Sequence, residues 1–158
     1  EVYLSMHDFE KSRISGQKAT SMNPNDPRVI SVFGEALLRL NDIDKGLEYL
    51  EKAYELDPIP QGQTTSDRRL AALFLGYFLK NDFTHCQKLN EDIVNIDIRT
   101  WLLNSYMCHK KEINYQEDSW FKAGVNQYQN SDWDMEVDRF HLNDDSLKTR
   151  LIDFAKTI

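Results

Sequence analysis

The clearest pattern of apolar and polar positions lies in residues 27–60. Ile30, Phe33 and Leu37 are three and four residues apart, as on one face of an amphipathic helix. No strand-like alternation interrupts the chain. The pattern predicts an all-α fold, with a nearly irregular stretch before the last helix. Helices are expected at about residues 9–22, 27–40, 44–57, 66–80, 84–96, 99–110, 116–129 and 144–157.

Similar residues recur 34 positions apart near the start of the chain. Lys18, Ala19, Met22, Asn23 and Pro24 correspond to Lys52, Ala53, Leu56, Asp57 and Pro58. This period is the length of a tetratricopeptide repeat, a pair of antiparallel helices that stacks on its neighbours. The repetition therefore predicts a tetratricopeptide-like right-handed superhelix of antiparallel helix pairs with a C-terminal closing helix.

Small residues and residues that end helices fit this interpretation within residues 27–60. Gly34 and Gly46 would let the two helices of the pair approach closely. Asn41 and Asp42 are typical of a tight turn, and Pro58 cannot continue the second helix. Each of these residues stands where a helix pair needs it.

A second pair follows after a longer loop. Asn81 and Asp82 repeat Asn41 and Asp42 at a spacing of 40, and the polar stretch 59–66 is expected to hold the added residues. Phe74 stands where the first pair has glycine, which leaves open whether this pair packs as closely.

The whole chain, residues 1–158, is therefore expected to be one tetratricopeptide-like domain. Its predicted parts are a partial repeat at 1–26, repeats at 27–60 and 61–98, a degenerate repeat at 99–130, and a closing segment and helix at 131–158. Residues 1–22 resemble the end of one helix and a second helix. This interpretation predicts that the chain begins inside a repeat and is an excised piece of a longer protein.

Charge and composition exclude several classes of protein. Acidic residues outnumber basic ones by 26 to 19, and the formal net charge is −7, so no nucleic-acid partner is expected. No apolar run approaches the length of a transmembrane helix. The first ten residues lack the pattern of a signal peptide. Cys86 and Cys108 are expected to be buried thiols rather than a disulfide.

No pattern of catalytic or metal-binding residues stands out. The four histidines are scattered, and none pairs with another histidine or cysteine at the spacing of a metal site. A Cys/His pair formed across helices stays open, but core thiols beside surface histidines are favoured. We therefore expect neither an enzyme nor a bound metal or cofactor.

The inner face of the superhelix is the candidate binding site. The first helix of each pair lines this face, and its non-core side chains would meet a partner. The candidate partner-binding residues are Arg28, Glu35, Arg39, Arg68, Leu75, Phe78 and Arg99. They predict a groove with a basic rim and an apolar floor, suited to an amphipathic helix with acidic ends. Alternatively, the closing helix, through Leu147, Leu151 and Phe154, or the segment around Trp133, fills the floor internally.

Three segments resemble the tetratricopeptide regions that follow class III adenylate cyclase domains or winged-helix regulators of the cadaverine-regulator type in bacteria. The segment Leu56–Pro60 is similar to their "LDP-x-P" junction, Leu73–Phe83 to their "LAYFLxGDY" segment, and Phe140–Lys156 to their closing helix. Thr157 follows Lys156 where a glycine is usual in that group. The resemblance implies a regulatory module and transfers no functional residue.

The expected function is therefore a protein-interaction or regulatory module of a bacterial signalling protein, with a protein or peptide as partner. The alternative is a small-ligand sensor domain with a pocket in the groove. Homo-oligomers are compatible with either function. As part of a larger protein, the module would lie on the cytoplasmic or periplasmic side of the inner membrane.

Overall fold

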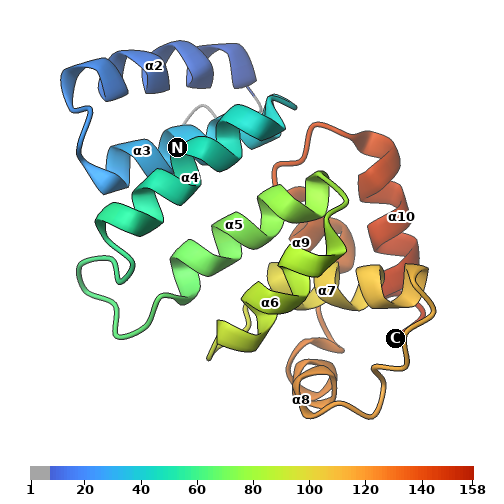
Figure 1. Cartoon of the computed structure of the whole chain (residues 1–158). Coiled ribbons are helices and arrows are strands. Elements are labelled where there is room, and N and C mark those ends of the chain that lie inside the picture. The colour runs from blue at the N-terminus through green and yellow to red at the C-terminus, as the bar shows by residue number, and fades with distance from the viewer. Residues whose placement is uncertain (1–7) are drawn as a thin grey trace. The chain divides into compact units, whose positions relative to one another are not determined.

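The computed structural model describes residues 8–158, and every regular element among them is a helix (Figure 1). The predicted all-α class is confirmed. The helix end expected within residues 1–7 lies outside the described residues. None of the helices that the structure describes is long and apolar enough to cross a membrane.

The chain divides into two compact units, residues 1–94 and 95–158. The first holds α2 (Phe9–Met22), α3 (Pro27–Arg39), α4 (Ile43–Leu56), α5 (Asp67–Leu79) and α6 (Phe83–Asp92). The second holds α7 (Ile98–Lys110), α8 (Ser119–Tyr128), α9 (Trp133–Asp138) and α10 (Asp145–Ala155). The assignment of all 158 residues to one domain stays a prediction.

Most helix bounds agree with the predicted ones within three residues, but α6 ends earlier than expected. Its last residue is Asp92 rather than a residue near 96. Ile93 follows in an extended conformation (ψ 119°), and its side chain is buried. The turn of the backbone there brings Ile93 into the core and stops the helix.

Aspartates begin several helices by accepting hydrogen bonds from otherwise unpaired amides of the first turn. Asp26 accepts from the amides of Arg28 and Val29 ahead of α3. Asp144 accepts from the amide of Leu147 at 2.8 Å at the start of α10. These short polar side chains fix where the helices start.

The tight turns of the first two pairs share one geometry. Asn41 and Asn81 have positive φ angles of 63° and 60°, which asparagine tolerates better than most residues. In each turn, the next amide donates back to a carbonyl of the preceding helix, from Asp42 to Leu37 and from Asp82 to Tyr77, both at 2.9 Å. This is the Schellman pattern of a helix end. The Asn-Asp turns predicted from their spacing are confirmed.

Helices α3 and α4 pack so closely that side chains are excluded at two positions. A Cβ atom at Gly34 would lie 3.0 Å from the carbonyl oxygen of Gly46, and one at Gly46 would lie 2.6 Å from a methyl carbon of Leu38. Figure 1 shows the two helices running side by side. The predicted role of both glycines is confirmed.

The next pair stacks on this one through a third glycine. A Cβ at Gly76 on α5 would lie 2.5 Å from a methyl carbon of Leu47 on α4, and α5 also contacts α3. Within the second pair, Phe74 is fully buried, and the Cys86 thiol lies 3.8 Å from the carbonyl oxygen of Phe74. A small residue on α6 thus makes room beside the large Phe74.

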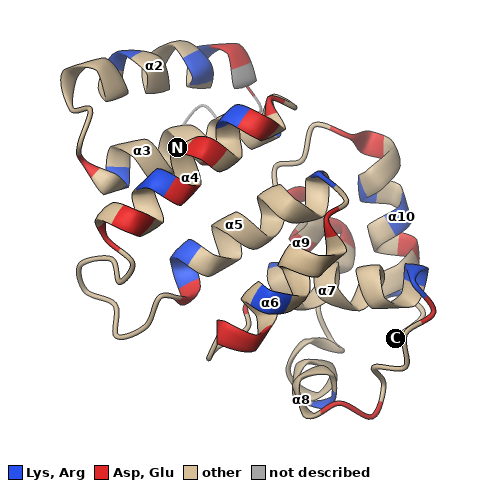
Figure 2. Cartoon of the chain, viewed as in Figure 1, with Lys and Arg blue, Asp and Glu red and all other residues tan. Residues whose placement is uncertain are grey.

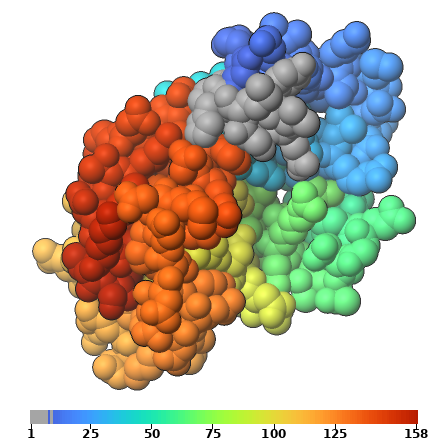
Figure 3. Space-filling view, turned by 180° about the vertical axis from the view of Figure 1, so that it is seen from behind, coloured from blue at the N-terminus to red at the C-terminus, as the bar shows by residue number. Residues whose placement is uncertain are grey.

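The second unit is built around Trp101 of α7, which is 1% exposed. Its ring stacks on Phe121 of α8 and Trp133 of α9, with ring centroids 5.6 and 6.1 Å apart. A Cβ at Gly124 would overlap the Trp101 ring. Helix α10 packs against both α7 and α9, and the space-filling view shows the residues of α9 and α10 side by side at the surface (Figure 3).

The stretch before the closing helix was expected to be nearly irregular. This prediction is wrong in one respect, because the stretch contains α9. Asp132 caps this short helix by accepting from the amide of Met135 at 3.2 Å. Trp133 and Val137, four residues apart on one face, are both buried. A helix of 6 residues shows too little periodicity to be recognised in sequence, and tertiary burial stabilises it.

Candidate interaction surfaces

Two of the predicted binding residues lie exposed at the starts of the inner helices α3 and α5. Arg28 pairs with Asp26, at 3.3 Å between guanidinium and carboxylate, and this interaction lowers the pKa of Asp26. Arg68 is also exposed. Because α3 and α5 contact each other, the first unit presents both arginines from neighbouring helices.

The predicted rim residue Arg39 is buried instead of exposed. Its side chain is 5% exposed, and one guanidinium nitrogen lies 3.1 Å from a carboxylate oxygen of Glu35 and 3.1 Å from the Glu35 carbonyl oxygen. Glu35 is half-buried. The pair is spaced by four residues on α3, so each charge has its counter-ion on the same helix face. Arg39 therefore contributes to this face through Glu35 rather than as an exposed cation.

The apolar floor of the predicted groove is largely inaccessible. Leu75 is 0% exposed, whereas Phe78 is half-buried. The seventh candidate, Arg99, is half-buried on α7 of the second unit. The role of these residues in binding a partner stays a prediction, and a partner can reach Phe78 more readily than Leu75.

The closing helix was the alternative occupant of the groove floor. Its apolar residues are buried in the second unit. Leu147, Leu151 and Phe154 lie on α10, and the Phe154 ring contacts the ring of Tyr106, with centroids 5.5 Å apart. Trp133 stacks on Trp101 in the same unit. That this helix also fills the groove floor of the first unit stays a prediction.

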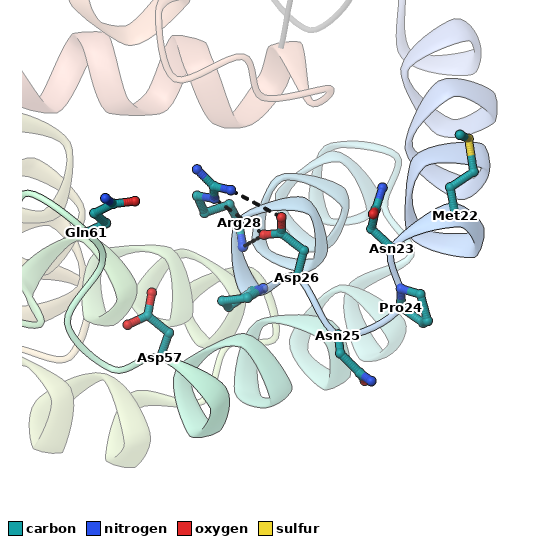
Figure 4. A pocket seen from close by; sticks show the side chains of 9 residues that line it. Met22, Asn23, Pro24, Asn25, Asp26, Arg28, Asp57 and Gln61 are labelled. Atoms are coloured by element: carbon teal, nitrogen blue, oxygen red, sulfur yellow. Dashed lines mark hydrogen bonds and ion pairs between the residues drawn. The ribbon is translucent and has the colours of Figure 1, made fainter.

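A depression in the first unit lies where α2 ends, α3 begins and α4 ends. Its volume is about 570 Å³, and it is lined by Met22, Asn23, Pro24, Asn25, Asp26, Pro27, Arg28, Asp57 and Gln61 (Figure 4). Residues 23–24 and 57–58 are equivalent positions of consecutive repeats. Of these lining residues, only Arg28 is among the predicted binding residues. The recurring dipeptides Asn23-Pro24 and Asp57-Pro58 are the sequence signal that could have indicated this depression.

A buried arginine holds one side of this depression in place. Arg69 is 4% exposed, and its guanidinium donates to the Asp57 carbonyl oxygen at 3.1 Å and lies 3.4 Å from the Asp57 carboxylate. Asp57 ends α4 and Arg69 belongs to α5. This ion pair therefore ties the end of one repeat to the start of the next.

The α4–α5 contact also has a polar edge. The Tyr77 hydroxyl donates to the Glu51 carboxylate at 2.6 Å, and Lys80 lies 2.8 Å from Asp44. Burial, together with the hydrogen bond to Glu51, raises the pKa of Tyr77 above its usual value. The ring of His85 on α6 stacks on Tyr77 with centroids 4.5 Å apart. Acidic and basic residues are interspersed along these helices (Figure 2).

The described residues offer little reactive chemistry. They contain no group of three or more His, Cys, Asp or Glu residues that could hold a metal ion. Both cysteines are buried, as predicted. Burial raises the pKa of the Cys86 thiol to about 12 and that of Cys108 to about 11, so both are protonated at neutral pH and poorly nucleophilic. That the chain is not an enzyme stays a prediction.

Comparison with known protein families agrees with the repeated geometry of the first unit. The family model described as tetratricopeptide repeat matches residues 28–60, which span nearly all of α3, the Asn41-Asp42 turn and α4. A comparison with curated proteins found no match. The chain thus contains a tetratricopeptide repeat region within an all-α, tetratricopeptide-like fold.

Proposed function

We propose that this chain is a protein-interaction module of a bacterial signalling protein and binds a segment of its partner along the inner helices α3 and α5. The observation that carries the proposal is the tetratricopeptide match at residues 28–60. Repeats of this family form extended surfaces that bind protein partners. The signalling and bacterial context rests on the resemblance of three sequence segments to regulatory proteins.

The accessible part of this face favours a partner segment with acidic residues. Arg28 and Arg68 are exposed at the first turns of α3 and α5, and Phe78 adds a half-buried aromatic surface near the end of α5. An amphipathic helix with acidic ends would place carboxylates near the arginines and apolar side chains along the helices. Arginines also recognise carboxylates with a bidentate geometry.

The test compares charge reversals on inner and outer helices. The double variant Arg28→Glu/Arg68→Glu changes the proposed face, and Lys45→Glu/Lys88→Glu makes the same change of charge at exposed positions of α4 and α6. Proteins of the source cells are captured on the immobilised chain and identified by mass spectrometry. Calorimetry then measures the affinity of each purified candidate, and circular dichroism confirms that both variants remain folded.

The proposal predicts that reversal on α3 and α5 weakens binding of a specific partner by about tenfold or more, because like charges then face each other. The reversal on α4 and α6 should change the affinity by less than about threefold, as expected for charges outside an interface. Equal losses in the two variants, or no specifically retained protein, would contradict the proposal.

The alternative is a small-ligand sensor domain with a pocket in the groove. The two functions differ in what the wild-type chain binds, so calorimetry with the captured protein separates them.

A further inference from the structure

The depression at the junction of the first two repeats has fixed walls. Its volume of about 570 Å³ lies within the range of ligand sites. The Lys52 ammonium donates to the carbonyl oxygen of Pro24 at 3.1 Å, and the Arg69 guanidinium donates to that of Asp57 at 3.1 Å. The rings of Pro24 and Pro27 restrict the backbone of one wall. A ligand can therefore bind without first ordering these walls.

The charges in the lining of the depression are already balanced. The Asp26 carboxylate lies 3.3 Å from the Arg28 guanidinium, and the Asp57 carboxylate lies 3.4 Å from that of Arg69. No other charged residue among those described lines the depression. An ionic ligand would have to compete with these pairs, so the lining favours a neutral one.

Three side-chain amides in the lining are available to a ligand. Asn23, Asn25 and Gln61 are exposed, and their side chains form no hydrogen bond with any described residue. Figure 4 shows the Gln61 amide pointing towards Arg28, with hydrogen bonds drawn only between Asp26 and Arg28. Each amide carries one acceptor oxygen and two donor hydrogens.

These amides are complementary to the peptide groups of an extended chain. A side-chain amide accepts from a main-chain N–H and donates to a main-chain carbonyl, and such bonds supply affinity when extended peptides are recognised. Pro24, Pro27 and Met22 add apolar surface to the lining. A sugar also forms hydrogen bonds in both directions, but none of the described lining residues has an aromatic ring on which a sugar could stack.

We infer that the depression binds a neutral, extended stretch of the partner's main chain through the side-chain amides of Asn23, Asn25 and Gln61. This inference rests on the proposed function, because Arg28 belongs both to the lining and to the proposed partner-binding face. The stretch would continue from the acidic residue that pairs with Arg28. Pairing with peptide groups selects an extended conformation rather than particular side chains.

Three uncharged probes test the inference by nuclear magnetic resonance titration of the full chain. The first is the blocked tripeptide acetyl-Ala-Gly-Ala-N-methylamide. The second is the same tripeptide with every main-chain nitrogen methylated, so that it cannot donate a hydrogen bond. The third is methyl α-D-glucoside, a sugar. Signals of the backbone amides and of the Asn and Gln side chains locate each probe.

Two double variants are compared with the wild type. Asn23→Leu/Gln61→Met removes two lining amides at nearly constant side-chain size. The matched control Gln17→Met/Gln87→Met removes two exposed amides of α2 and α6 outside the depression. Circular dichroism checks that both variants are folded.

The wild type should bind the tripeptide saturably, with signal shifts at residues 22–28 and 57–61. Asn23→Leu/Gln61→Met should weaken this binding by about tenfold, as expected for the loss of two neutral hydrogen bonds. The control variant should change the affinity by less than about twofold. The methylated tripeptide should bind about tenfold more weakly than the unmethylated one, and the glucoside should not bind.

The inference is overturned if the tripeptide causes no saturable shifts at the depression, or if Asn23→Leu/Gln61→Met binds it as tightly as the control variant does. Equal affinities of the two tripeptides would exclude pairing with main-chain N–H groups. Binding of the glucoside at the depression with at least the affinity of the tripeptide would assign the site to sugars instead.

Because the probes are uncharged, this experiment is separate from the test of the proposed function. Loss of partner binding in Arg28→Glu/Arg68→Glu, together with no binding of the tripeptide, would contradict the inference alone. Binding of the tripeptide without any charge-dependent partner would contradict the proposed function alone.

Discussion

Replacing Gly34 by alanine adds one methyl group at the closest contact between α3 and α4. The new Cβ would lie 2.9 Å from the Leu50 Cγ and 3.0 Å from the carbonyl oxygen of Gly46. Both distances are short for non-bonded atoms. The oxygen belongs to the backbone of α4, and Leu50 is 2% exposed, so neither neighbour can move without shifting the helix or the core.

Two opposing effects set the magnitude. Alanine favours a helix over glycine by about 1 kcal/mol, whereas overpacking a well-filled contact costs about 1–3 kcal/mol. The constrained surroundings of Gly34 favour the upper part of that range. We therefore expect Gly34→Ala to lower the free energy of unfolding by about 1–2 kcal/mol, and the larger Gly34→Leu to lower it further.

Urea unfolding followed by far-UV circular dichroism measures the loss. Glu48 is exposed on α4, so the difference between Glu48→Ala and Glu48→Gly gives the helix-propensity effect without a steric one. The steric cost equals the loss of unfolding free energy in Gly34→Ala plus this helix-propensity difference. In the background of Leu50→Ala, which removes one of the two clashing groups, Gly34→Ala should cost less.

A Gly34→Ala chain that gains stability by the amount of the Glu48 comparison would refute the reasoning. The added methyl group would then meet open space, and α3 and α4 could not be in contact at this glycine. The close packing of the first pair, and the repeat assignment that rests on it, would be wrong.

The remaining predictions concern thiols, a tyrosine and a helix cap. Cys86 and Cys108 should react with a thiol reagent at pH 8 only after unfolding, because burial raises the pKa of each thiol. Protein that is unfolded without prior reduction should still show both thiols, because neither cysteine is in a disulfide. Tyr77→Phe should cost about 1 kcal/mol in urea unfolding, since it removes the hydrogen bond to Glu51. The raised pKa of Tyr77 stabilises the fold fully below the unfolded value near 10, so wild-type stability should fall as pH rises above about 10, and Tyr77→Phe should reduce that fall. Asp144→Ala should destabilise α10 by about 1 kcal/mol, measured by the same unfolding experiment, because the first turn loses its cap.

The sequence alone determined the local features of this protein. Gly34 and Gly46, the Asn-Asp turns and Pro58 each act through backbone sterics or hydrogen bonds to residues close in the chain, so their spacing predicted the helix pairs. These features are local, and their positions recur with the repeat.

Only the tertiary structure decided which polar and apolar side chains are accessible. Arg39 and Arg68 are both predicted rim residues, yet the first is buried against Glu35 and the second is exposed. Helix α9 is too short for its own pattern to reveal, and Trp133 stabilises it through contact with Trp101. A pocket of the second unit is lined by residues of α7, of the connection from α7 to α8, of α8 and of the segment after α10. Burial and pocket formation depend on residues far apart in the chain, and a pattern of spacings carries no information on those contacts.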